Sequence, residues 1–73
     1  MNGKEKRFIE SPVLKEEIYQ AADEIAFQAK SMKAEASLIR SDIYYLDFKI
    51  ARIRLMIEEI ERIVNTERGE VIE

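Results

Sequence analysis

The sequence predicts a mostly α-helical fold in which a short extended segment precedes the helices, and three observations lead to this prediction. The only proline, Pro12, follows Ser11, a pair that is typical of a helix start. No glycine occurs between Gly3 and Gly69, so the chain between Pro12 and Gly69 has no strong helix breaker. Apolar residues recur there at intervals of three and four, which is the spacing of one helix face.

The first helix is expected to begin at Pro12 and to end near Ser31. Ser31 can cap a following helix, and Lys30 suits the carboxyl end of a preceding one. A single continuous helix from Pro12 to Glu67 is the alternative, although it would be unusually long. The apolar face of the first helix consists of Leu14, Ile18, Ala21, Ile25, Ala29 and Met32.

The rest of the chain repeats apolar residues with a period of 3.5, the mark of helices that pack along a common seam. We expect a second helix up to residue 48 and a third over residues 49–67, with a tail at 68–73. No breaker marks the boundary between Asp47 and Arg52. Gly69 is expected to end the last helix. The seam residues are Ala36, Ile39, Ile43, Leu46, Ile50, Ile53, Ile57, Ile60 and Val64.

Chain length indicates a single domain over residues 1–73 that depends on association. The 73 residues include no cysteine and no histidine, so neither a disulfide nor a typical zinc site can reinforce the small core. A homodimer is therefore expected. No apolar run is long enough to span a membrane, and no signal peptide is evident, so a cytoplasmic protein without membrane contact is predicted.

The composition argues against an enzyme. Histidine and cysteine are absent, and the two glycines form no phosphate-binding loop. The carboxylates lack the accompanying histidines of a helical metal site. We expect no catalytic residue, no metal and no cofactor.

The charge is unevenly distributed along the chain. Residues 1–7 carry three basic groups and one acidic group, and residues 31–54 carry five and three, whereas the whole chain has a net charge of −3. Nucleic acid would meet these two basic segments. The acidic C-terminal segment would instead suit a protein partner.

A basic arm, a capped helix and then the tripeptide Leu38-Ile39-Arg40 resemble, in this order, the ribbon–helix–helix DNA-binding family (MetJ/Arc-like). The resemblance covers residues 4–48 and extends to the ribbon–helix–helix proteins of archaeal spindle-shaped viruses, which also have an extra C-terminal helix. It implies an N-terminal strand that pairs across a homodimer, followed by two helices, with residues 49–67 stabilising the dimer. It further implies a transcriptional regulator that reads double-stranded DNA in the major groove, in the host cytoplasm if viral.

Strand parity decides which side chains would read the bases in such a ribbon. If Ile9 points inward, Lys4, Lys6 and Phe8 face the DNA. If Phe8 points inward, Glu5, Arg7 and Ile9 face it instead. We favour the first arrangement because it places two lysines against the polyanion.

Phosphate contacts are expected from three further residues. Arg7 would flank the ribbon, whereas Lys33 and the backbone N–H of Ala34 would lie at the start of the second helix, where N–H groups can hold phosphates. The alternative is a solvated arm and an ordinary exposed lysine.

Two other functions account for the same helices. An antiparallel helical-hairpin adaptor that dimerises and binds another protein explains the 3.5-residue period equally well, but it leaves the basic arm unexplained. An antitoxin would combine DNA binding at its N-terminus with an acidic C-terminal helix that blocks a toxin.

Overall fold

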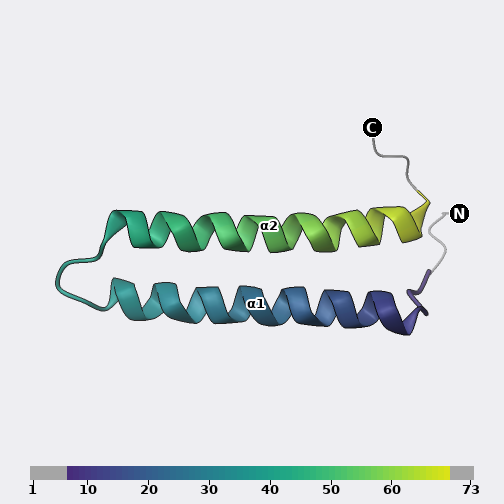
Figure 1. Ribbon diagram of the computed structural model, residues 1–73, viewed down its shortest axis with the longest axis horizontal. Coiled ribbons are helices and arrows are strands. Elements are labelled where there is room, and N and C mark those ends of the chain that lie inside the picture. Colours follow the sequence, from purple (N-terminus) through teal and green to yellow (C-terminus); the bar gives the residue numbers. More distant parts are fainter. Residues whose placement is uncertain (1–6, 70–73) are drawn as a thin grey trace, which may run out of the picture.

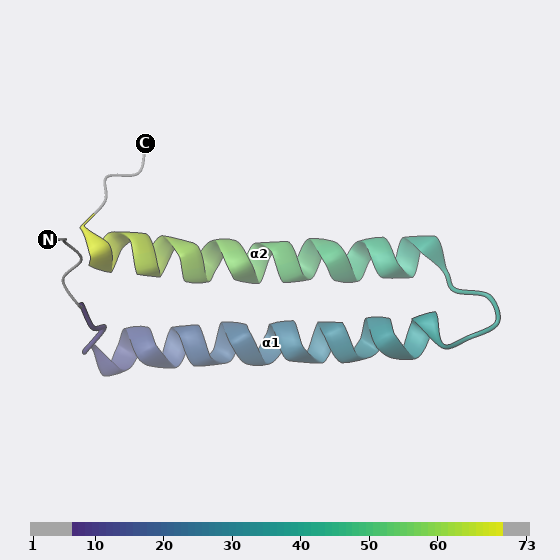
Figure 2. The same cartoon turned by 180° about the vertical axis from the view of Figure 1, so that it is seen from behind.

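The computed structural model describes residues 7–69, which form an antiparallel hairpin of two long helices. Helix α1 spans Pro12–Ala36 and helix α2 spans Ile43–Arg68. Residues 37–42 join them in a turn at one end of the hairpin, and the start of α1 lies beside the end of α2 at the other (Figure 1). The view from behind shows the same side-by-side arrangement along the full length of both helices (Figure 2).

The start of α1 confirms the prediction from Ser11 and Pro12. The Ser11 hydroxyl oxygen accepts a hydrogen bond from the Leu14 N–H at 3.2 Å, which satisfies one of the donors that a helix start leaves open. Pro12 occupies the first turn, where its missing N–H costs nothing.

The expected break at residues 31–33 is wrong, because α1 continues to Ala36. The helix ends where Ser37 closes it: the Ser37 N–H donates to the Ala34 carbonyl at 3.2 Å, and the Ser37 hydroxyl donates to the same oxygen at 2.7 Å. After the turn, the carboxylate of Asp42 accepts from the N–H groups of Tyr44 and Tyr45 and starts α2.

The ribbon–helix–helix fold is also wrong for this chain. Residues 7–69 contain no strand, and α2 runs unbroken through the boundary expected between a second and a third helix. Leu38, Ile39 and Arg40, which supported the resemblance, lie in the turn rather than in a helix. Residues 4–6, which were predicted to belong to the strand, lie outside the described part of the chain. The helical character itself is confirmed.

The two helices meet along a seam with a 3.5-residue period, but most of the seam residues predicted for the second part of the chain are wrong. Leu46, Ile53 and Ile60 lie in the seam, whereas the other predicted residues are exposed: Ala36, Ile39, Ile43, Ile50, Ile57 and Val64. On α1, Gln28 takes the place predicted for Ala29. Each seam position is buried or half-buried, and the steps alternate between three and four residues on both helices. The α1 side consists of Leu14, Ile18, Ala21, Ile25, Gln28 and Met32, and the α2 side of Leu46, Lys49, Ile53, Met56, Ile60 and Ile63. Two of these positions, Gln28 and Lys49, are polar, so the seam is not a purely apolar core.

Gly69 ends α2, as predicted. Its φ of 90° lies in the left-handed region, and its N–H is bonded to the carbonyls of Asn65 and Thr66. Neither α1 nor α2 contains a stretch long and apolar enough to cross a membrane.

Candidate interaction surface

The residues expected to read DNA from a strand do not form one in the described part of the chain. Lys4 and Lys6 lie outside the described residues. Arg7 lies at the open end of the hairpin, where its Nη1 donates to the Arg68 carbonyl at 2.9 Å. Phe8 is exposed and belongs to neither helix. Arg7 therefore helps to close the open end of the hairpin.

Lys33 and Ala34 lie in the last turn of α1, not at the start of a second helix as expected. The groups left open at a helix C-terminus are carbonyls, and the helix dipole is negative there. The Ala34 carbonyl indeed accepts two bonds from Ser37. The phosphate contact predicted for Lys33 and Ala34 depended on a helix that starts at these residues, and that placement is wrong.

The dominant feature of the described surface is exposed apolar area. Among residues 7–69, only two apolar residues, Ala21 and Ile63, are buried, whereas fourteen large apolar side chains are exposed. Ile39, at the tip of the turn, is 104% exposed relative to its reference state. Leu38, Ile43 and Tyr44 are exposed beside it, so the turn end of the hairpin is apolar.

Three exposed aromatic side chains surround Lys49, which is half-buried. We call these four residues the aromatic patch: Phe27 of α1 with Tyr45, Phe48 and Lys49 of α2. The Lys49 Nζ lies 4.9 Å from the ring centre of Tyr45, 5.7 Å from that of Phe27 and 6.0 Å from that of Phe48. At these distances the ring quadrupoles attract the ammonium group. The patch thus presents three aromatic rings arranged around one positive charge.

A polar cluster lies beside the aromatic patch and links the two helices. The Glu24 carboxylate accepts from the Gln28 side-chain amide at 2.6 Å and from the Arg52 guanidinium at 3.4 Å. The hydrogen bond from Gln28 lowers the pKa of Glu24 below its ordinary value, and Arg52 and Lys49 lower it further. Glu24 is therefore held as a carboxylate that fixes the register of α1 against α2.

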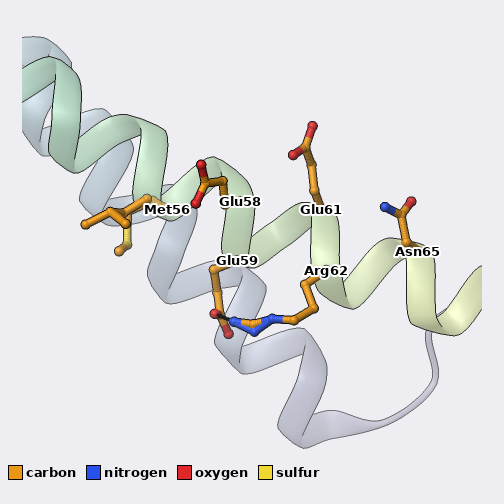
Figure 3. A pocket seen from close by; sticks show the side chains of 7 residues that line it. Met56, Glu58, Glu59, Glu61, Arg62 and Asn65 are labelled. Atoms are coloured by element: carbon orange, nitrogen blue, oxygen red, sulfur yellow. Dashed lines mark hydrogen bonds and ion pairs between the residues drawn. The ribbon is translucent and has the colours of Figure 1, made fainter. Parts of the chain in front are cut away.

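A shallow hollow on the second half of α2 offers no chemistry. It is lined by Leu55, Met56, Glu58, Glu59, Glu61, Arg62 and Asn65 (Figure 3). Arg62 is ion-paired with Glu59, and the Glu61 carboxylate points away into solvent. Within residues 7–69, no group of acidic side chains is arranged to hold a metal ion.

A second apolar surface lies on the other side of the hairpin from the Glu24–Arg52 pair. Residues two positions apart on a helix point about 200° apart, so Ala22 lies across α1 from Glu24 and Ile50 lies across α2 from Arg52. Residues seven apart share a face. We call the resulting surface the alanine–isoleucine face; it consists of Ala22, Ala29, Ala36, Ile43, Ile50, Ile57 and Val64.

The fold defines the chain as an antiparallel helical hairpin. No protein-family model matches the sequence, and no curated protein or solved structure is significantly similar to the chain. The function is therefore argued from the surface of the hairpin itself.

Proposed function

We propose that this protein is a helical-hairpin adaptor: a non-catalytic protein that acts as a homodimer and binds a helix of another protein through its aromatic patch. The observation that carries the proposal is the excess of exposed over buried large apolar side chains. Contiguous exposed apolar surface of this kind marks interaction sites in soluble proteins.

Energetics support an associated form over an isolated hairpin. Fully burying a Leu, Ile or Phe side chain stabilises a protein by about 1.5–3 kcal/mol, and nine of the seventeen such side chains within residues 7–69 are exposed in the hairpin. Two positions of the seam are occupied by the polar residues Gln28 and Lys49, which bury less apolar area than Leu or Ile would. Docking of a second apolar surface would supply the missing burial.

The chemistry of the patch indicates the class of partner. Exposed aromatic rings from two adjacent helices suit an amphipathic helix that packs its apolar face against them. The half of the hairpin that contains the patch, residues 22–54, carries six basic and five acidic side chains, a net charge of +1, and Lys49 lies among the rings. The preferred partner is therefore an amphipathic helix that places an acidic residue near Lys49.

The adaptor proposal is tested by site-specific photo-crosslinking. A benzophenone amino acid replaces Phe48 in the patch or, as a control, Tyr19. Tyr19 is a similarly exposed aromatic residue that lies on α1 about 12 Å from Phe27, toward the start of the helix. In cells that produce the protein, we expect the Phe48 derivative to crosslink one other protein that the Tyr19 derivative does not. Lys49→Glu should abolish this product by reversing the charge among the rings.

Double-stranded DNA is the competing ligand in this test. Residues 7–69 provide no strand with which to read a groove. Fluorescence anisotropy with duplex DNA across a salt series measures this directly, because phosphate contacts make affinity fall steeply with salt. Tight, salt-sensitive DNA binding together with no selective crosslink from Phe48 would overturn the adaptor proposal.

A further inference from the structure

We infer that the alanine–isoleucine face is covered by a second copy of this chain, with both turns at the same end and α1 of each hairpin against α2 of the other. This inference rests on the proposed homodimer and adds its face, orientation and register. The resulting assembly is a four-helix bundle.

The shape of the face supports a self-complementary contact. On α2, Ile43, Ile50, Ile57 and Val64 follow one another at intervals of seven and are all exposed, so they form a ridge. On α1, exposed alanines recur at the same interval at positions 22, 29 and 36 and form a groove. Rotation by 180° about an axis parallel to the helices places the ridge of each copy over the groove of the other.

The register follows from contacts within one hairpin. Glu24 is bonded to Arg52, and Lys49 lies over Phe27, so residue 24 is level with residue 52 and residue 27 with residue 49. Helices related by the proposed rotation keep the same levels. Ile50 then lies between the partner's Ile25 and Ala29. Ile57 correspondingly lies between Ile18 and Ala22 of the partner, as knobs pack into holes.

The charges along the edges of the face favour this orientation. In the proposed register Lys30 is level with the partner's Asp47. Asp23 is likewise level with Arg54 of the partner, and Lys15 with its Glu61. All three pairs are of opposite sign. Exposed ion pairs contribute little affinity, but they select among registers and orientations.

The opposite orientation, with the turns at different ends, matches charges poorly. It would pack α2 against α2 and set Ile50 beside the partner's Ile57. Asp47 would then be level with Glu61 of the partner, and Arg54 would lie beside its own copy. This orientation would also bring the positive turn end of each hairpin near the negative open end of the other, which attracts. Salt screens charges separated by more than roughly 8 Å, so the repulsion between the nearby like charges outweighs that attraction.

Disulfide trapping distinguishes the two orientations, and the absence of native cysteine makes each introduced pair unambiguous. Chains with Ile50→Cys are mixed with chains carrying either Ala29→Cys or Ile57→Cys and are oxidised mildly. Because a disulfide requires Cβ atoms about 4 Å apart, the mixed disulfide reports direct contact. We expect the hetero-disulfide with Ala29→Cys to predominate several-fold, as measured by mass spectrometry. Predominance of the product with Ile57→Cys would overturn the proposed orientation.

Sedimentation equilibrium of the unmodified protein tests the dimer itself. Twice the monomer mass is expected at micromolar concentration. Ile57→Asp should yield a helical monomer, whereas Leu55→Asp, at an exposed apolar position two residues away and therefore on the other side of α2, should leave the dimer intact. An unmodified protein that sediments as a monomer would remove the basis of this inference. The crosslink from Phe48 would still test the adaptor function separately.

Discussion

The turn between the helices depends on Asp42, and its substitution tests how the hairpin is closed. The Asp42 carboxylate accepts hydrogen bonds from the N–H groups of Tyr44 at 2.9 Å and Tyr45 at 3.2 Å. The Asp42 N–H donates to the Glu35 carboxylate at 2.7 Å, which ties the start of α2 to the end of α1. Asp42→Ala removes the first two bonds and leaves the third.

The expected loss follows from the geometry of the cap. Replacing an N-cap Asp with Ala costs roughly 0.5–2 kcal/mol, and because Asp42 is exposed, water can satisfy the freed N–H groups. We therefore expect a loss of about 1 kcal/mol in the free energy of unfolding. For a chain of this size, that loss lowers Tm by roughly 4–8 °C.

Urea and thermal unfolding followed by far-UV circular dichroism measure the loss. All variants are compared at one protein concentration, because the proposed dimer would make Tm depend on concentration. Asp42→Asn keeps a side-chain oxygen acceptor and should retain most of the stability. If Asp42→Asn is as unstable as Asp42→Ala, the two hydrogen bonds are not the cause of the loss. If the free energy of unfolding of Asp42→Ala equals that of the unmodified protein, the capping argument is refuted.

Three further predictions concern the ends, the register and the patch. Gly69→Ala should destabilise the last turn of α2 by about 1–2 kcal/mol, seen as faster amide exchange there, because Gly69 has a φ of 90°. The pKa of Glu24 is lowered in the folded state, so its contribution to stability is present above the ordinary pKa and is lost as pH falls through the lowered value. Glu24→Gln should therefore flatten the acid limb of a pH series of urea unfolding curves. Lys49→Gln should cost about 0.5–1 kcal/mol in the same unfolding assay, because it removes the cation from the rings.

The ends of the hairpin could be predicted from the sequence because each depends on local chemistry. Ser11 with Pro12 and the left-handed Gly69 act within one turn of their own position, and the structure confirms both. The 3.5-residue period was right for the seam, but its residues were only partly right, because Ile50 and Ile57 are exposed and Lys49 and Met56 lie in the seam instead.

The position of the turn could not be found from periodicity. Ala36, Ile39 and Ile43 continue the alternation of three and four across a segment that is not helical, so the pattern concealed the break. The hydroxyls of Ser37 and Ser41 bond to the carbonyls of Ala34 and Glu35, as short polar side chains do when they compete with helical hydrogen bonds. The cluster of such side chains at residues 37–42 was the signal for the turn.

The aromatic patch depends on a contact that a sequence pattern cannot supply. Tyr45 and Phe48 are close in the sequence, but Phe27 joins them only because α1 and α2 pair in one particular register. That register depends on where the turn lies and on the Glu24–Arg52 contact. A helix break placed a few residues earlier would bring a different part of α1 to Lys49.

The apolar arc on α2 is broad enough for both contacts that we propose, one with a second copy of the chain and one with a partner helix. A helix that packs on a single neighbour needs an apolar stripe little more than about 100° wide. On α2 the stripe that faces α1, which includes Ile53 and Ile60, is flanked by the exposed ridge of Ile50 and Ile57. The aromatic patch flanks the seam on its opposite side. Because the seam separates the two surfaces, a second copy on the alanine–isoleucine face leaves the aromatic patch open, and the dimer can present two such patches at once.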